Sequence, residues 1–260
     1  MTDPIPEDAI APATSPDEQS SSHLISRILS PAIQFWLRSQ VEQVKTLHFE
    51  IQGGDRQILG GQIAGAIVTA EGAVYQGLHL TQVDLRATGI RVNLGQVLRG
   101  KPLRLLAIVP VVGTLRLSEA DLNASLQAPL LAAAVREWLM TLLQSEKLSI
   151  LPEDLAPEAI AFEQLQISLG EQRLILMAEV LGTAGRSLPL TLGFGLQVVE
   201  GHLLQVISPQ WFPQRNARRG LPLPEMEGFQ IDLGADVNLE TLTLSPGALT
   251  CQGRINVIPV

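Results

Sequence analysis

Histidine, cysteine and serine are the side chains most often used in metal binding and nucleophilic catalysis, and their spacing in this chain supports neither. The four histidines lie far apart, and no two have the i, i+4 spacing of a metal site. The sequence contains no Gly-x-Ser-x-Gly, Gly-x-Gly-x-x-Gly or P-loop motif. We therefore predict no catalytic residue, no metal ligand and no cofactor. The histidines are His23, His48, His79 and His202.

The single cysteine, Cys251, has no His or Cys-x-x-Cys partner nearby, so we interpret it as a buried structural thiol. One cysteine also excludes an internal disulfide framework. Asp232 and Asp236 are near enough in sequence to form a carboxylate pair, but they flank a Gly-Ala turn, where solvated side chains are the better interpretation. An enzyme acting on an apolar substrate stays an alternative that no residue pattern supports.

Two basic segments have the composition of a membrane-contacting surface. The turn at 99–104 concentrates three cations, and the segment 211–220 sets two large aromatic side chains beside three arginines. Aromatic rings favour the headgroup level of a membrane, and arginines pair with lipid phosphates. The alternative is that the aromatics close one end of the core and the arginines are solvated. The predicted headgroup and membrane contacts are Arg99, Lys101, Arg104, Trp211, Phe212, Arg215, Arg218 and Arg219.

The composition indicates a folded domain preceded by an acidic segment. The chain has 260 residues and is 46% hydrophobic but only 4% aromatic, so aliphatic side chains must fill its core. Its net charge is −8, of which residues 1–22 contribute −5, and this balance argues against a nucleic-acid binder. Residues 1–22 are rich in proline, serine and acids, which predicts disorder, and they have neither the basic start nor the apolar stretch of an export signal.

The hydropathy pattern also excludes a membrane-spanning helix, because no window has the roughly 18 consecutive apolar residues that one requires. We therefore predict a cytoplasmic protein that can lie on the surface of an internal membrane. We expect a tail at 1–22 and a single lipid-binding domain at 23–260, built from two halves that each contain a helix followed by strands.

Two segments have the apolar spacing of amphipathic helices. Within residues 24–44, apolar side chains recur every three to five positions, and Pro31 suits the first turn of a helix. The second segment follows Ser118, which together with Asp121 resembles a capping box. Pro129 should kink or divide this second helix.

Nearly all of the remaining sequence alternates with the two-residue period of β-strands. The clearest case is the segment 188–198, whose even-numbered residues are all apolar. We predict an α+β fold in which two long helices pack in a strongly curved antiparallel β-sheet. Glycines inside the strand segments either bend this sheet or mark ordinary turns, and they are Gly60, Gly61, Gly65, Gly72, Gly193 and Gly195.

Five short motifs stand out beside the periodic segments. They are Gly72-Ala73-Val74-Tyr75-Gln76-Gly77-Leu78, Ile90-Arg91-Val92-Asn93, Leu98-Arg99-Gly100-Lys101-Pro102-Leu103, Ser118-Glu119-Ala120-Asp121-Leu122-Asn123 and Ile231-Asp232-Leu233-Gly234-Ala235-Asp236-Val237. Together they resemble the LmeA family of phospholipid-binding proteins, over roughly residues 24 to 258. The motifs are structural, and none is a catalytic signature.

The resemblance implies a fold like the tubular lipid-binding domains, with long helices cradled in a bent sheet. It also implies that phospholipid binds in an enclosed apolar groove. The chain looks closest to the cyanobacterial type of member, which faces internal membranes from the cytoplasm. Actinobacterial members are exported and act in cell-envelope glycolipid assembly, and this role is not carried over because the chain lacks an export signal.

We therefore predict non-catalytic binding of phospholipid or another apolar lipid in an elongated groove, as a carrier, a sensor or a membrane-associated lipid chaperone. The expected partners are phospholipid and, transiently, a membrane surface. The alternative is a structural or adaptor module that binds a protein partner without lipid. The predicted groove residues, which plain core packing would also explain, are Ile33, Leu37, Val41, Leu126, Leu130, Val135, Leu139, Leu190, Leu192, Phe194 and Leu196.

Overall fold

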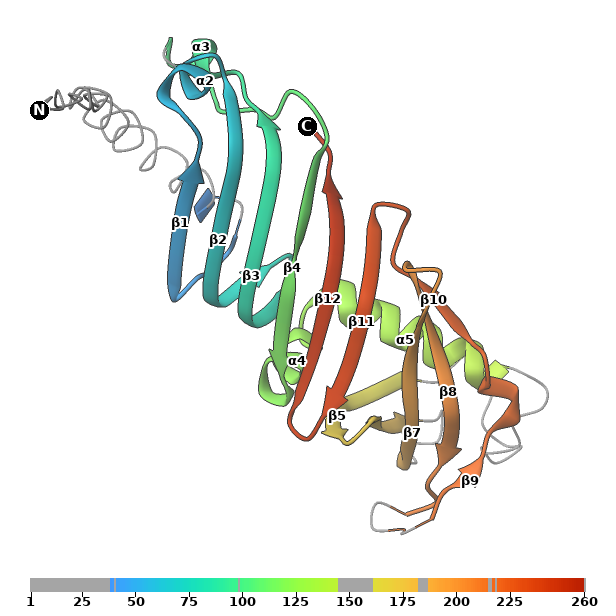
Figure 1. Cartoon of the computed structure of the whole chain (residues 1–260). Coiled ribbons are helices and arrows are strands. Elements are labelled where there is room, and N and C mark those ends of the chain that lie inside the picture. The colour runs from blue at the N-terminus through green and yellow to red at the C-terminus, as the bar shows by residue number, and fades with distance from the viewer. Residues whose placement is uncertain are drawn as a thin grey trace, which may run out of the picture.

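A computed structural model of the chain describes residues 38–39, 41–97, 99–144, 161–181, 187–214, 217 and 219–259. These residues form two antiparallel β-sheets with short helices between and beside them (Figure 1). The first sheet has the strand order β1-β2-β3-β4-β12-β11. Its strands are β1 (Thr46–Gln52), β2 (Gln62–Tyr75), β3 (Leu78–Arg91), β4 (Val109–Ser118), β11 (Val237–Ser245) and β12 (Ala248–Val257).

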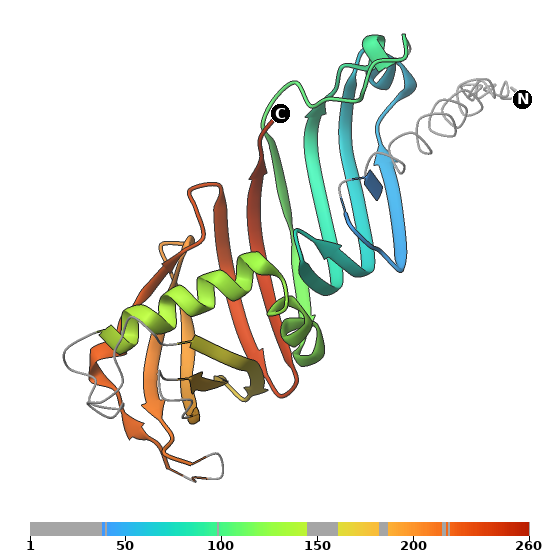
Figure 2. The same cartoon turned by 180° about the vertical axis from the view of Figure 1, so that it is seen from behind.

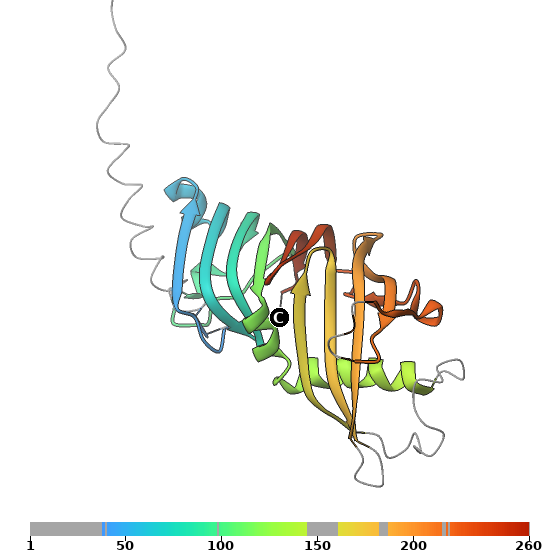
Figure 3. The ribbon, with the colours of Figure 1, turned by 90° about the horizontal axis from the view of Figure 1, so that it is seen from below.

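The second sheet has the strand order β10-β8-β7-β6-β5, with the short strand β9 paired to β8. It adjoins the first sheet along β11, which contacts β5, β6 and β7 (Figure 3). Its strands are β5 (Ala161–Gly170), β6 (Arg173–Leu181), β7 (Ser187–Val199), β8 (Leu203–Trp211), β9 (Leu221–Pro222) and β10 (Gln230–Asp232). The helices are α2 (Asp55–Leu59), α3 (Leu94–Val97), α4 (Glu119–Ser125), α5 (Pro129–Gln144) and the 3₁₀ turn η2 (Pro224–Met226).

The prediction of two long helices packed in one curved sheet is wrong, because the described residues are mostly strand and their longest helix, α5, has 16 residues. At the end of the first predicted helix, the chain is bonded to a strand. The Glu42 N–H donates to the Val74 carbonyl oxygen (2.9 Å), and the Val74 N–H donates to the carbonyl oxygen of Gln43 (2.8 Å). These bonds replace the i→i−4 bonds that a helix would make.

The second predicted helix is divided at Pro129, as its sequence indicates. Helix α4 ends at Ser125, and α5 begins at Pro129, whose ring nitrogen has no hydrogen to donate to a preceding turn. The start of α4 is confirmed, because the Ser118 hydroxyl accepts a hydrogen bond from the Asp121 N–H (3.1 Å). The predicted strand at 188–198 is also confirmed as β7.

Two groups of buried side chains hold the sheets and helices together. The larger group lies between α4, α5 and both sheets, and includes Leu139, Val180 and Val206, all fully buried. The smaller group lies at one end of the first sheet, where Ile58 of α2 packs with side chains from β1 to β4. Leu85 packs against both groups, so the apolar interior is continuous from one end of the first sheet to the second sheet.

Helix α4 is joined to the first sheet by hydrogen bonds from its polar side chains. The Ser125 hydroxyl accepts a bond from the His79 N–H (2.8 Å), and the Thr81 hydroxyl donates to the Asp121 carboxylate. Partial burial opposes the charge on Asp121, but the Thr81 and Ser118 hydroxyls outweigh it and lower the pKa of this carboxyl.

The same helix is joined to the second sheet from its other side. The Asn123 side chain accepts a hydrogen bond from the Ile167 N–H (2.7 Å) and donates one to the Ile167 carbonyl oxygen (2.8 Å). The Glu119 carboxylate accepts a bond from the Leu169 N–H (2.7 Å). Because these bonds satisfy backbone groups of β5, α4 fixes where the second sheet lies relative to the first.

Replacement of Asp121 by asparagine should destabilise the fold in a pH-dependent way. The folded-state pKa of Asp121 is depressed, so its carboxylate adds stability above the unfolded-state pKa, and this contribution is lost as the pH falls through the folded-state value. At pH 7 we expect Asp121→Asn to lower the free energy of unfolding by about 1 kcal/mol. Urea denaturation at pH 7 and at about pH 3 should show the difference shrinking. The same difference at both pH values would contradict this role.

Gly113 of β4 lies where the neighbouring strand approaches too closely for a side chain. A Cβ on Gly113 would overlap the backbone carbonyl oxygen of Asp84. We expect Gly113→Ala to lower the free energy of unfolding by about 1–3 kcal/mol, because the backbone must move to accept it. The matched control is Gly95→Ala in α3, where a Cβ meets nothing within 4 Å. Equal shifts of the thermal unfolding midpoint in both variants would contradict this close approach.

Candidate functional site

One face of the first sheet is apolar across all six strands. The strand register forms three successive cross-strand rows on it, and all eighteen positions are aliphatic, aromatic, glycine or cysteine. We call this surface the apolar face. Its rows are Leu47-Ala70-Val83-Leu115-Cys251-Leu242, Phe49-Val68-Leu85-Gly113-Gly253-Leu239 and Ile51-Ala66-Ala87-Val111-Ile255-Val237.

The apolar face has the dimensions of a lipid tail. Six strands about 4.8 Å apart span about 24 Å, and three rows extend about 13 Å along the strands. For comparison, half of the roughly 30 Å hydrocarbon core of a bilayer gives an acyl chain a reach of about 15 Å. An extended acyl chain therefore fits on this face across the strands.

The described elements that pack on the apolar face lie near its two ends and along β11, where α5 and the second sheet adjoin it (Figure 2). Helix α2 contacts β2 at one end, and α4 contacts β3 and β4 at the other; Figure 2 views the molecule from the side of α4 and α5. Between them, Val68, Leu85 and Leu239 of the middle row are half-buried, and Ile255 at the β12 side of the third row is 43% exposed. Among the described residues, the middle of the face is thus less covered than its ends.

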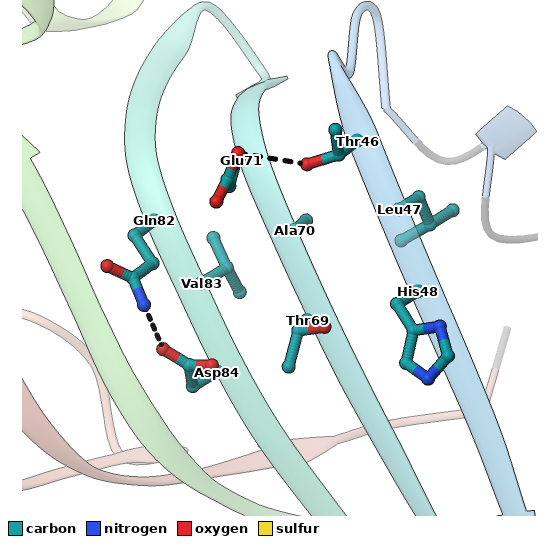
Figure 4. A pocket seen from close by; sticks show the side chains of 9 residues that line it. All are labelled: Thr46, Leu47, His48, Thr69, Ala70, Glu71, Gln82, Val83 and Asp84. Carbon is teal, nitrogen blue, oxygen red and sulfur yellow. Dashed lines mark hydrogen bonds between the residues drawn. The ribbon is translucent and has the colours of Figure 1, made fainter.

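The opposite face of the first sheet is polar, and its hollows do not suit a lipid tail. Hollows of about 170 and 270 Å³ on this face are lined by threonine, glutamine and charged side chains as well as by apolar ones. Figure 4 shows the smaller one, where Thr46 donates to Glu71 (3.3 Å) and Gln82 donates to Asp84 (2.9 Å). Both volumes fall below the roughly 300–1,000 Å³ of typical ligand pockets.

A third hollow, of about 200 Å³, lies beside the start of α4. Lys45, His79 and Asp121 are among the residues that line it. The Asp121 carboxylate is already bonded to the hydroxyls of Thr81 and Ser118, which leaves it serving the helix start. This group therefore has a structural role at the joint between α4 and the first sheet.

Most of the predicted groove residues that the structure describes meet in the larger buried group. Leu126 and Leu139 come from the helices, and Leu190, Leu192 and Phe194 from β7, and all five are buried. Val135 and Leu196 pack against this group. These side chains cover one another, and they lie between α5 and the sheets. Val41 is half-buried; Ile33, Leu37 and the side chain of Leu130 lie outside the described residues.

The aromatic residues of the segment 211–220 face the protein. Trp211 packs against the larger buried group, and its Nε1 is buried without a hydrogen-bond partner. Phe212 packs on Gly193 and under the Arg173 guanidinium, which lies 5.9 Å from the ring centroid. Arg219 is exposed. Arg215 and Arg218 lie outside the described residues, so the membrane contact predicted for this segment stays a prediction.

The basic turn at 99–104 is held in place by one buried side chain, which the sequence analysis named only as part of a motif. The Asn93 side chain donates to the Pro102 carbonyl oxygen (2.9 Å) and accepts from the Arg104 N–H (2.7 Å). Asn93 itself is 7% exposed. Arg99, Lys101 and Arg104 are all exposed, so a fixed loop presents their charges to solvent.

The apolar face is the site that the sequence alone did not assemble. Period-two alternation predicted its strands, but only the register shows which apolar positions of β1 to β4 share a face with β11 and β12. Among the described residues, no three His, Cys, Asp or Glu side chains gather in a metal-binding group. No helix within this described part is long and apolar enough to cross a membrane.

Comparison with known proteins agrees with the chemistry of the apolar face. A family model described as LmeA-like phospholipid-binding matches residues 21–254. The chain belongs to this family. The resemblance predicted from the sequence motifs is therefore confirmed. No curated protein and no solved structure matches the chain.

The motifs that carry the family resemblance lie largely at structural joints. Glu119, Asp121 and Asn123 of one motif join α4 to both sheets. Asn93 of another motif holds the basic turn. Glu119, Asp121, Asn123 and Asn93 of these motifs thus maintain the frame around the apolar face through bonds within the protein.

Cys251 provides an intrinsic probe of the apolar face, because it lies in the first row between Leu115 and Leu242. Burial raises the pKa of its thiol to about 11. At pH 8 only about one thiol in a thousand is then the reactive thiolate, and we expect slow labelling by a thiol reagent such as DTNB. The rate should rise steeply up to about pH 11 and increase at once on denaturation. Rapid labelling of the native protein at pH 8 would contradict this placement.

Proposed function

We propose that this LmeA-like protein is a non-catalytic phospholipid carrier whose lipid tail lies on the apolar face. The observation that carries the proposal is the unbroken set of apolar rows over six strands. A soluble sheet normally covers such a face with its own side chains. Here the described covering elements pack near its ends and along β11, and leave Val68, Leu85 and Ile255 partly accessible.

The energetics support this placement. Each buried CH₂ contributes about 0.8 kcal/mol, so ten methylenes on the apolar face contribute about 8 kcal/mol. This corresponds to a dissociation constant of about 1 μM before the costs of association are subtracted. Because those costs weaken binding further, this upper limit favours a lipid that is held in transit and released over a permanent structural lipid. The buried groups around α5 then serve as the rigid support of the face.

Val68 and Ile67 offer a matched test, since they are adjacent β-branched residues on opposite faces of β2 and both are half-buried. We expect Val68→Asn to reduce the phospholipid carried by the protein at least about tenfold, because an amide on the apolar face loses its hydration against a lipid tail. Ile67→Asn should keep the lipid. Native mass spectrometry of the purified proteins gives the lipid mass, and extraction identifies it.

The comparison is made on variants whose thermal unfolding midpoints show that both are folded. Equal loss of lipid in Val68→Asn and Ile67→Asn would show that the lipid does not lie on the apolar face. Absence of bound lipid in the native protein, together with no uptake from phosphatidylcholine vesicles, would refute the carrier proposal.

A further inference from the structure

The end of the first sheet that carries α2 and α3 combines exposed apolar side chains with positive charge. At this end β1 and β3 finish and β2 and β4 begin, and the end of β12 lies beside the start of β4 (Figures 1 and 2). We call α2, α3, the loop 99–108 and residues 258–259 the α3 tip. Among the described residues, four of the nine exposed large hydrophobic side chains lie here: Leu59 (55%), Leu106 (61%), Ile108 (57%) and Ile258 (53%).

The apolar side chains of the loop have a regular outward placement. Leu105 packs against the smaller buried group and Val109 belongs to it, whereas the alternate residues Leu106 and Ile108 face solvent. The Leu106 N–H donates to the Arg91 carbonyl oxygen (2.8 Å), which ties this loop to the end of β3. Leu106 and Ile108 are therefore exposed on a loop whose backbone is hydrogen-bonded to the sheet.

Cations surround these apolar side chains. Arg91, Arg99, Lys101 and Arg104 are exposed at this end, and Arg56 of α2 is exposed beside them. The acidic residues at the same end are Asp55 and Asp236. No acid occurs in the sequence between Asp84 and Glu119, so residues 85–118, which include the end of β3, the loop and β4, carry positive charge only.

We propose that the α3 tip docks the protein on an anionic phospholipid bilayer. Arg99, Lys101 and Arg104 contact lipid phosphates, while Leu106 and Ile108 enter the interface. Aliphatic side chains beside cations suit a bilayer surface, where charged headgroups lie directly above the hydrocarbon of the acyl chains. A nucleic acid would use the cations but not the exposed aliphatics.

The α3 tip lies beside the apolar face, so docking there brings the proposed lipid site close to the bilayer. This step rests on the proposed carrier function. The smaller buried group lies directly behind the tip, and it includes Phe49, Ala66 and Val111 of the apolar face. Leu85 continues this apolar surface toward the second sheet. The side chains between the tip and the middle row of the apolar face are thus apolar, which favours the passage of a lipid tail from the bilayer to the face.

Vesicle co-sedimentation of the full chain tests the docking, with phosphatidylcholine vesicles that contain or lack phosphatidylserine. Each cation near an anionic surface strengthens binding about fivefold, so Arg99→Glu/Lys101→Glu/Arg104→Glu should weaken binding to the serine-containing vesicles by at least about a hundredfold. The control is Arg116→Glu/Arg136→Glu, which reverses two exposed charges away from the tip and outside the basic segment 211–220. This control should lose less than about fivefold.

A second pair of variants tests the apolar contact. Leu106→Asn/Ile108→Asn should weaken vesicle binding about tenfold or more, because both side chains lose their favourable transfer from water. Leu221→Asn/Ile231→Asn removes two exposed hydrophobic side chains from the second sheet and should leave binding unchanged. Equal losses in the tip variants and their controls would overturn the proposal, and so would native protein that does not sediment with serine-containing vesicles.

The lipid content of the same variants separates the docking from the carrier function. Native mass spectrometry should find phospholipid still bound to the charge-reversed tip variant, because its apolar face is intact. Loss of vesicle binding with retained lipid supports the α3 tip as the docking surface. Retained vesicle binding in the tip variants rejects the tip, while the Val68→Asn comparison still decides where the lipid lies.

Discussion

The apolar face of the first sheet is the constraint on which the rest of the structure depends. Eighteen aligned positions on six strands lack any side chain that water would solvate well. Apolar surface of this extent must be removed from water, by the protein itself or by a guest. The small group of side chains around Ile58 covers one end and the larger group around Leu139 covers the other. The middle row supplies the surface that a lipid tail can complete.

The frame around this face is maintained by polar side chains at two joints. At one joint, α4 satisfies backbone groups of β3 and β5 through Ser125 and Asn123. At the other, Asn93 closes the loop that carries Arg99 to Arg104. Buried polar groups of this kind are costly unless every partner is in place, so each joint favours a single geometry. This explains why Asn93 and Asn123 are polar residues within the family motifs although the proposed lipid tail is apolar.

The two faces of the first sheet and its α3 tip have separate chemistries. Alternate residues of the same strands give an apolar face and a polar face, because successive side chains point to opposite sides. The polar face has hydrogen-bonded pairs such as Gln82 with Asp84 and is stable in water. The tip mixes both kinds of side chain, which suits a boundary between water and hydrocarbon. In the proposed function, one sheet therefore holds the tail, faces solvent and meets the membrane.

Several of the local elements could be predicted from the sequence. Period two predicted β7, the Ser118 cap predicted the start of α4, and Pro129 predicted the break before α5. These signals depend on side chains within a few residues of one another, and such interactions act before the chain has folded. The family was also recognisable from its short motifs, which the matching model confirms over residues 21–254.

Only the tertiary structure decided what those elements build. Apolar periodicity at Val41 and Val44 suggested a helix, but backbone bonds around Val74 hold this stretch beside β2. Likewise, the strands β11 and β12 join β4 although more than a hundred residues separate them in sequence. Register across such a distance depends on which hydrophobic faces meet, and no local pattern contains that information. The sequence alone thus determined the strands and the family, while long-range pairing determined the apolar face.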